Sequence, residues 1–236
     1  MHDLLKDGIL CLSQGDKDIE LIIDSRFDEI VSRLDRYVKE IELFNEAYGL
    51  VGAVNSEELI VKHILDSVAP IGILYRLLCG DKTNFADTIQ IADVGSGAGL
   101  PGIPLAIALS CLPTGESCNF SLIERMGRRV GFLHNVKAVL SLDNITIEES
   151  EVEKIKPEQF SLVVFRAFKP LEPKLLKTLL KVCAPGGIIA AYKGKSDKID
   201  AEMTALQSAE NKIEWEAIPY TVPFLDEQRH ILVIRK

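Results

Sequence analysis

Helical spacing of hydrophobic residues dominates the first third of the chain. From position 27 onward, apolar residues recur at 27, 30, 31, 34, 38 and 41, which places them on one face of a helix. Gly49 is expected to end this helix. Asn55, with Glu58 three positions later, predicts a capped start for the next helix, which Pro70 should interrupt. We therefore expect residues 1–85 to form an N-terminal helical extension that packs on the core.

The pattern changes after position 86, where short apolar runs begin to alternate with helical stretches. Such alternation is typical of βαβ units and a parallel sheet. The predicted parallel strands are Ile89–Val94, Phe120–Ile123, Ile145–Ile147, Leu162–Phe165 and Ile188–Tyr192. Only a loop separates Ile213–Ile218 from His230–Ile234, which predicts a terminal antiparallel hairpin. Residues 86–236 should thus form an α/β core with a mostly parallel, doubly wound, seven-stranded sheet.

Composition and charge narrow the class of protein. The 236 residues are 47% hydrophobic and 26% charged, as expected for one folded core with a small appendage. No run reaches the roughly 20 apolar residues of a membrane span, and residues 1–7 lead into no signal-like apolar stretch. We expect a cytoplasmic protein that has no membrane partner. The net charge of -8 argues against nonspecific coating of nucleic acid, although it leaves room for an enzyme with one basic face.

The five cysteines give no sign of a metal site or a disulfide framework. They are Cys11, Cys79, Cys111, Cys118 and Cys183, and none belongs to a C-x-x-C pair. We expect buried or half-buried reduced thiols, and no bound metal.

A glycine-rich turn is the strongest chemical signal. Residues 91–102 read I-A-D-V-G-S-G-A-G-L-P-G, in which a buried strand ending near Asp93 runs into the turn and then into a helix. The dinucleotide fingerprint needs its third glycine where Leu100 stands, which disfavours a nicotinamide oxidoreductase, and the lysine of a phosphate-binding P-loop is missing. The spacing G-x-G-x-G after an acidic strand end is the one found in enzymes that bind S-adenosyl-L-methionine.

A second carboxylate supports this interpretation. Glu124 ends the next strand and follows Gly95 by 29 positions, and the loop at 113–115 can absorb the excess over the expected spacing of about 20 residues. A carboxylate there could accept hydrogen bonds from both ribose hydroxyls. The alternative is an exposed acid at a strand end.

Further polar residues follow the predicted strands. Three arginines between positions 125 and 129 could bind phosphate or the carboxylate of the cofactor, or could simply cover a helix. Residues 150–153 follow the third strand, Arg166 ends the fourth, and Lys193 ends the fifth. Because ligands bind beyond the carboxyl ends of parallel strands, we expect these residues to converge on one crevice.

The chain resembles the glucose-inhibited division protein B family, bacterial methyltransferases that act on guanine N7 in small-subunit ribosomal RNA. The resemblance covers nearly the whole chain. Its most specific blocks are His63–Ser67, which reads H-I-L-D-S, and Asp93–Pro104. The other blocks are Phe44–Leu50, Gly127–Leu133, Arg166–Phe168, Tyr192–Gly194 and Arg229–His230.

The resemblance implies a Rossmann-like class I methyltransferase fold, S-adenosyl-L-methionine as cofactor, and 16S ribosomal RNA or the small ribosomal subunit as partner of a monomeric enzyme. It also implies cofactor contacts at several of the positions above. With the glycine turn, the candidate cofactor-binding residues are Asp93, Gly95, Gly97, Gly99, Leu100, Glu124, Val152, Glu153 and Arg166.

The implied reaction needs little acid–base chemistry. Guanine N7 carries a lone pair and can attack a sulfonium methyl group directly, so catalysis would consist mostly of alignment. Arg166 and Lys193 are the candidate catalytic residues, acting by positioning rather than as a general base. We interpret His63 as a helix-packing residue, and the roles of Arg229 and His230 stay open. Methylation of a small molecule or a protein, or cofactor binding without turnover, are the alternatives.

Overall fold

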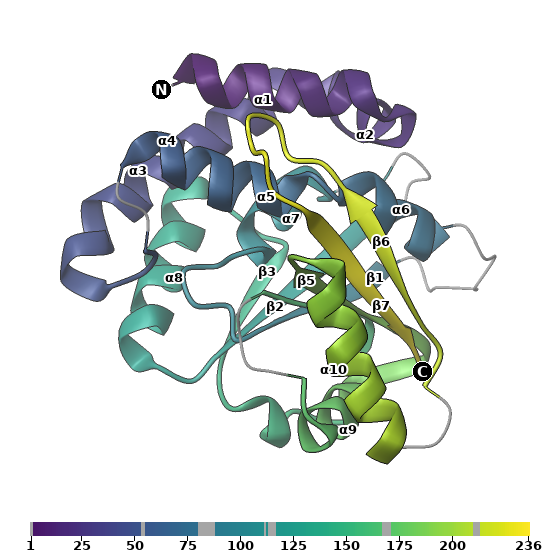
Figure 1. Cartoon of the computed structure of the whole chain (residues 1–236). Coiled ribbons are helices and arrows are strands. Elements are labelled where there is room, and N and C mark those ends of the chain that lie inside the picture. The colour runs from purple at the N-terminus through teal and green to yellow at the C-terminus, as the bar shows by residue number, and fades with distance from the viewer. Residues whose placement is uncertain are drawn as a thin grey trace.

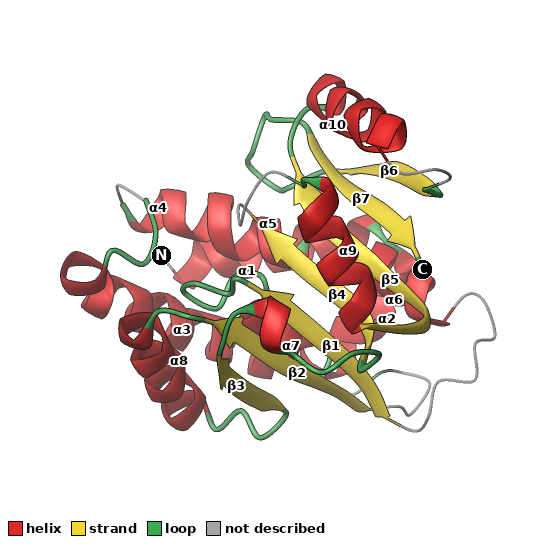
Figure 2. Ribbon diagram, turned by 90° about the horizontal axis from the view of Figure 1, so that it is seen from below, coloured by secondary structure: helices red, strands yellow, loops and turns green. Residues whose placement is uncertain are grey.

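Seven strands form one mixed sheet at the centre of the molecule (Figure 2). They are β1 (Thr88–Val94), β2 (Ser117–Glu124), β3 (Ile145–Glu149), β4 (Phe160–Arg166), β5 (Cys183–Lys193), β6 (Trp215–Tyr220) and β7 (Arg229–Arg235). Their order is β3-β2-β1-β4-β5-β7-β6, and the first five strands are parallel. Strand β7 is antiparallel to both β5 and β6. The predicted doubly wound sheet with a terminal antiparallel hairpin is therefore confirmed.

The computed structural model describes residues 2–52, 55–79, 88–110, 112, 117–166, 171–209 and 213–236. The helices are α1 (His2–Gly15), α2 (Lys17–Ile23), α3 (Phe27–Tyr48), α4 (Ser56–Leu59), α5 (Asp66–Val68), α6 (Ile71–Cys79), α7 (Gly102–Ala108), α8 (Gly127–Leu140), α9 (Pro173–Val182) and α10 (Ser196–Ala209). Short 3-10 turns occupy Asp24–Arg26 and Val152–Lys154. Within these ranges, no helix combines the length and the apolar character that crossing a bilayer would need.

Both faces of the sheet are covered, which explains why its strands are near-continuous apolar runs. Along β4, Leu162 and Val164 belong to a hydrophobic cluster that also holds α7, α8 and the helices before β1. Their neighbours Val163 and Phe165 point the other way, into a cluster with α9 and α10. Figure 1 shows these two helical layers on opposite sides of the sheet.

The helical pattern before β1 agrees with the observed helices. Five of the six apolar positions singled out are buried, namely Ile30, Val31, Leu34, Val38 and Ile41, and Phe27 is half-buried. Gly49 ends α3 in a left-handed conformation, with φ of 59°. The Asn55 side chain caps α4 by accepting a hydrogen bond from the Glu58 amide at 2.8 Å. After Pro70, a new helix begins at Ile71.

Some boundaries differ from the expectation. The segment after α4 is a π-helix, Ile60–Leu65, because apolar periodicity does not report which carbonyl each amide bonds to. Helix α8 begins at Gly127, so Arg128 and Arg129 lie in its first turn. Strand β6 starts at Trp215 instead of Ile213, because its pairing with β7 begins at Trp215, opposite Ile234. The predicted end of the helical region falls partly on residues 80–87, outside the described residues.

The cysteines are mostly as expected. Cys118 and Cys183 are buried, and Cys79 is half-buried. Cys11 contradicts the prediction of a buried or half-buried thiol: it is exposed, at the cavity between α1–α2 and the β6–β7 connection. Cys111 lies outside the described residues.

A buried tyrosine connects the helices before β1 to the glycine turn. Tyr37 of α3 is fully buried, and its hydroxyl donates a hydrogen bond of 2.6 Å to the Ala98 carbonyl oxygen. Burial raises the pKa of the phenol well above its usual value, so the hydroxyl remains a donor at any physiological pH. This hydrogen bond ties helix α3 to the glycine turn.

Replacing Tyr37 with Phe should lower the free energy of unfolding by about 1 kcal/mol, because the buried Ala98 carbonyl loses its donor. Urea unfolding measures this loss. The matched control is Tyr48→Phe, since the Tyr48 ring packs on Phe44 and its hydroxyl has no hydrogen-bond partner in the described ranges. Equal stability of the two variants would contradict the expectation.

Candidate cofactor and substrate site

The predicted glycine turn joins β1 to α7 at the carboxyl edge of the sheet. Gly95, Gly97 and Gly99 have φ values of 70°, 60° and 94°, in the left-handed region that favours glycine. At Gly99 a Cβ would also lie only 2.3 Å from Cδ1 of Ile103. The amides of Gly95 and Ser96 donate to the Ile123 carbonyl at 2.9 and 3.1 Å, which ties the turn to β2.

Asp93 closes this turn from below. Its carboxylate is fully buried, and Oδ2 accepts hydrogen bonds from the Ser96 hydroxyl at 2.7 Å and the Gly102 amide at 2.9 Å. Among the described residues, Oδ1 is buried without a partner. Burial raises the pKa of Asp93 to about 6, although the two hydrogen bonds oppose the rise. The turn therefore rests on a carboxylate that retains an unsatisfied acceptor.

Glu124 lies at the edge of the turn, at the end of β2. It is 4% exposed, so the alternative of an exposed strand-end acid does not apply. Its Oε2 accepts from the Gly97 amide at 3.0 Å, and its Oε1 accepts from the Arg125 and Met126 amides at 2.8 and 2.9 Å. Because an ionised carboxylate has about four acceptor positions, these backbone bonds fix Glu124 without using all of them.

Two cavities flank the glycine turn and share Gly95 and Arg129 in their walls. The first, of about 460 Å³, includes the predicted residues Gly95, Glu124, Val152 and Glu153. The second, of about 400 Å³, includes the predicted residues Gly95, Gly97, Leu100 and Arg166. Asp93 and Gly99 are buried beneath them. A further cavity of about 470 Å³, between α1–α2 and the β6–β7 connection, contains none of the predicted site residues.

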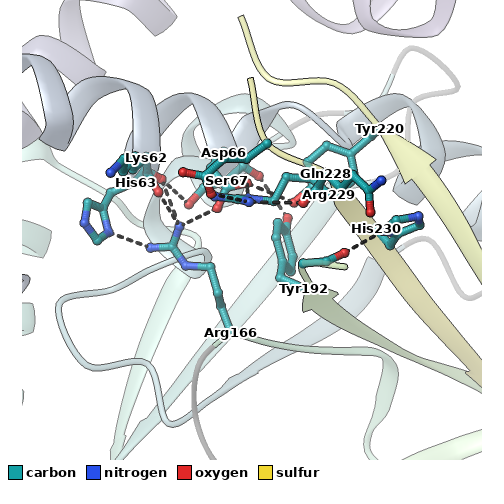
Figure 3. Close-up of polar contacts among 12 residues, drawn as sticks. Lys62, His63, Asp66, Ser67, Arg166, Tyr192, Tyr220, Gln228, Arg229 and His230 are labelled. Atoms are coloured by element: carbon teal, nitrogen blue, oxygen red, sulfur yellow. Dashed lines mark hydrogen bonds and ion pairs between the residues drawn. The ribbon is translucent and has the colours of Figure 1, made fainter. Parts of the chain in front are cut away.

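Arg166 lines the second cavity together with residues of the turn. Its Nη1 lies 3.1 Å from Oδ2 of Asp66, and its Nη2 lies 3.2 Å from Nδ1 of His63 (Figure 3). A guanidinium can only donate, so Nδ1 of His63 accepts and the imidazole is neutral. Burial, and then the charge of Arg166, lower the pKa of His63 to about 4. His63 thus lines the cavity, which the helix-packing interpretation did not anticipate.

Lys193, the second candidate catalytic residue, lies apart from Arg166 and His63. Its Nζ lies 2.6 and 3.0 Å from the two carboxylate oxygens of Glu202 on α10, and the described residues that line the two flanking cavities do not include it. His230 donates from Nδ1 to the Gly194 carbonyl at 2.6 Å. Of the three neighbouring arginines, Arg129 approaches Glu124 to 3.9 Å, while the other two are exposed.

Asp66 is a residue of the site for which the sequence predicted no role. It belongs to the H-I-L-D-S block, which was the available signal, but its partners are more than 90 residues away in the chain. The Asp66 carboxylate binds Arg166 with one oxygen, and Tyr220 and Arg229 with the other. Arg229 also pairs with Glu227 at 2.9 Å. Local sequence cannot show such long-range partners.

Comparison with known proteins gives consistent matches over most of the chain. Residues 30–232 match the family described as rRNA small subunit methyltransferase G, GidB. The chain is 36% identical to ribosomal RNA small subunit methyltransferase G of Treponema denticola over 250 residues, which covers 99% of this chain and 96% of that protein. It is 37% identical to the protein of the same name from Treponema pallidum, over 99% of this chain and 93% of that one. For Klebsiella pneumoniae the identity is 34%, with coverage of 88% and 90%.

Solved structures show the same fold at low identity. A SAM-dependent methyltransferase from Aquifex aeolicus has a TM-score of 0.51 at 16% identity, covering 71% of this chain and 90% of that one. A protein of Methanococcus maripaludis assigned as an S-adenosyl-L-methionine-dependent methyltransferase has a TM-score of 0.56 at 14% identity, covering 84% and 91%. The chain therefore has the predicted Rossmann-like methyltransferase fold.

Gly102→Ala tests the packing beneath the turn. A Cβ at Gly102 would lie 2.6 Å from Oδ2 of Asp93 and 2.5 Å from Cδ2 of Leu122, so something must shift. We expect a loss of about 1–3 kcal/mol in the free energy of unfolding, as is usual for an overpacked core. The control is Gly131→Ala in α8, where nothing lies within 4 Å and the added methyl group should stabilise the helix by up to about 1 kcal/mol. Thermal unfolding that ranks Gly102→Ala at or above the control would be inconsistent with this packing.

Proposed function

The chain belongs to the rRNA small subunit methyltransferase G family, and from this membership and the site we propose that it methylates 16S ribosomal RNA at guanine N7. The methyl donor is S-adenosyl-L-methionine. The observation that carries the proposal is the glycine turn between two cavities, with the buried carboxylate of Glu124 at its edge. We further propose that the protein acts as a monomer in the cytoplasm.

The residues present fit S-adenosyl-L-methionine. The turn forms a cradle that a side chain at Gly99 would obstruct, and Asp93 retains a buried acceptor without a partner among the described residues. In the first cavity, Glu124 is suited to the ribose hydroxyls, and Val152 with Glu153 to the adenine ring. The turn itself, with Leu100, would hold the methionine part on the side of the second cavity.

The bound donor would supply an electrophilic methyl group on a sulfonium, which a guanine N7 lone pair can attack without a general base. The protein's share of the work is alignment and charge. Arg166 lies in the second cavity, where its guanidinium can donate to an acceptor on the guanine or on a phosphate. His63 stays neutral near pH 7 and adds no second positive charge. Lys193 would have to leave Glu202 in order to act, so we assign the positioning role to Arg166 first.

An acidic chain must bind RNA through local basic groups. With a net charge of -8, phosphate contacts have to come from cations that stand near the cavities. Arg125, Lys154 and Lys174 are exposed and lie around the first cavity and the small hollow next to it. Arg128 is exposed on α8, directly after the end of β2. We propose that these side chains receive the RNA backbone beside the site.

The direct test is methyl transfer from tritium-labelled S-adenosyl-L-methionine. We expect label in one guanine of small subunits or 16S ribosomal RNA, at a position where borohydride and aniline cleave the chain, as they do at N7-methylguanine. Arg166→Ala should abolish transfer and leave the protein folded, as judged by circular dichroism, because Asp66 keeps Arg229 as an ion-pair partner. Label in metabolites or proteins, with none in RNA, would instead favour the alternative substrates.

Cofactor affinity should depend on pH through Asp93. Its pKa of about 6 means that a proton occupies the carboxylate below pH 6, whereas a cationic ligand over the turn favours the ionised form. The dissociation constant for S-adenosyl-L-methionine should therefore rise by about tenfold as pH falls from about 7 to 5, a window in which an α-amino group stays protonated. Calorimetry at both pH values measures the change, and Asp93→Asn, which keeps an acceptor oxygen, should remove it. If the dissociation constant of Asp93→Asn rose between pH 7 and 5 as much as that of the wild type, Asp93 would be excluded as the titrating group.

A further inference from the structure

The Asp66 carboxylate joins the helices before β1 to the ends of three strands. Asp66 begins α5, directly after the π-helix, and is 5% exposed (Figure 3). Its Oδ2 lies 3.1 Å from Nη1 of Arg166, at the end of β4. Its Oδ1 accepts from the Tyr220 hydroxyl at 3.0 Å and from Nε of Arg229 at 3.2 Å, at the adjoining ends of β6 and β7. One side chain thus receives donors from three strands.

The same point is anchored from β5. The Tyr192 hydroxyl donates to the Ser67 carbonyl at 2.9 Å, and the Tyr192 ring meets the Tyr220 ring edge-on at 6.3 Å. The Ser67 hydroxyl in turn donates to the His63 carbonyl at 2.6 Å. Asp66 is therefore held in place by packing and hydrogen bonds that do not involve Arg166.

Arg166, by contrast, is oriented entirely from the helix side. Besides Asp66, its Nη1 lies 3.2 Å from the Lys62 carbonyl oxygen, and its Nη2 lies 3.2 Å from Nδ1 of His63. Those partners sit on one edge of the planar guanidinium, and Nε has no acceptor among the described residues. The group is fixed in plane while donor capacity remains available in the second cavity.

Stability alone is a weak reason for this arrangement. The side chains of Arg166 and Arg229 are 15% and 16% exposed, so two guanidinium groups and one carboxylate have been taken largely out of water. Desolvation of such ions consumes most of their mutual attraction, and apolar residues of similar size often stabilise a fold as well or better. Because Glu227 also pairs with Arg229 at 2.9 Å, the two arginines and the two carboxylates of this group balance in charge.

We infer that Asp66 is a positioning residue for methyl transfer: it aligns Arg166 in the cavity that the glycine turn also lines, and the terminal hairpin holds Asp66 through Tyr220 and Arg229. The kinetic part of this inference rests on the proposed function. The structural part, the orientation of Arg166, does not, and it can be measured without RNA.

Asp66→Asn is the first test, because Asn keeps the shape and one acceptor oxygen and loses the charge. In the full-length wild type, the Nε–H of Arg166 should give an NMR signal with restricted motion, assigned by its loss in Arg166→Lys. In Asp66→Asn that signal should move to the position and mobility of a solvated arginine. The control is Asp35→Asn on α3, where the aspartate is similarly buried and pairs with Lys39, and where the Arg166 signal should not change. An Arg166 signal that is unchanged in Asp66→Asn would overturn the inference.

The kinetic test is a double-mutant cycle. Asp66→Asn should lower kcat for RNA methylation by about 10- to 100-fold, the usual cost of misplacing a group at a reacting centre. In an Arg166→Lys background, which has no guanidinium to align, the same change should cost less than twofold. Equal losses in both backgrounds would mean that Asp66 acts independently of Arg166 and would refute the inference.

Tyr220→Phe provides a variant that keeps the Asp66–Arg166 ion pair. It removes one donor to Oδ1 of Asp66, and we expect a three- to tenfold lower kcat with unchanged circular dichroism, an effect that should vanish in the Asp66→Asn background. A loss that persists there would assign Tyr220 a separate role and contradict its part in the inference. If the wild type does not methylate RNA, the proposed function fails, while the NMR experiment still decides whether Asp66 orients Arg166.

Discussion

A buried carboxylate beneath a glycine turn is the constraint on which the site depends. Asp93 is buried away from water, and its Oδ2 accepts from the Ser96 hydroxyl and the Gly102 amide. These two bonds draw the start of α7 and the middle of the turn together. The close approach leaves no room for a Cβ at Gly102. Both cavities are defined by the path that the turn takes as a result. A change beneath the turn should therefore affect cofactor and substrate together.

Three carboxylates divide the work at this edge of the sheet. Asp93 shapes the turn, Glu124 ties its outer side to β2 through backbone amides, and Asp66 reaches the far wall from the helices before β1. Each is buried, and each is compensated by donors rather than by solvent. Asp66 pairs with two guanidinium groups, so it adds little negative charge beside the second cavity, where Arg166 keeps donor capacity.

Much of this arrangement could be predicted from sequence because it is local. Strand runs, the turn at 95–99 and the cap at Asn55 are set by residues a few positions apart, and the rule that ligands gather at the carboxyl ends of strands placed Glu124 and Arg166 near the turn. Partners chosen by tertiary packing could not be predicted. Lys193 ends its strand as expected, yet Glu202 on the following helix captures its charge, and no sequence pattern distinguishes it from Arg166. The contacts of His63 and Asp66 are with residues of β4 and of the terminal hairpin, which are far away in the sequence.

The helices before β1 are therefore more than a cover for one face of the sheet. Leu50, Lys62, His63 and Asp66 line the second cavity, and Tyr37 holds the turn that also lines it. Hydrophobic burial fastens these helices to the sheet, since Ile30, Leu34 and Ile64 share a cluster with the residues of β1 and β2. The same burial fixes the distance between Asp66 and the strand ends, which the polar contacts alone could not do in water. In this chain the apolar core therefore sets the distances between these elements, and the few buried charges then orient Arg166 in the cavity that the glycine turn also lines.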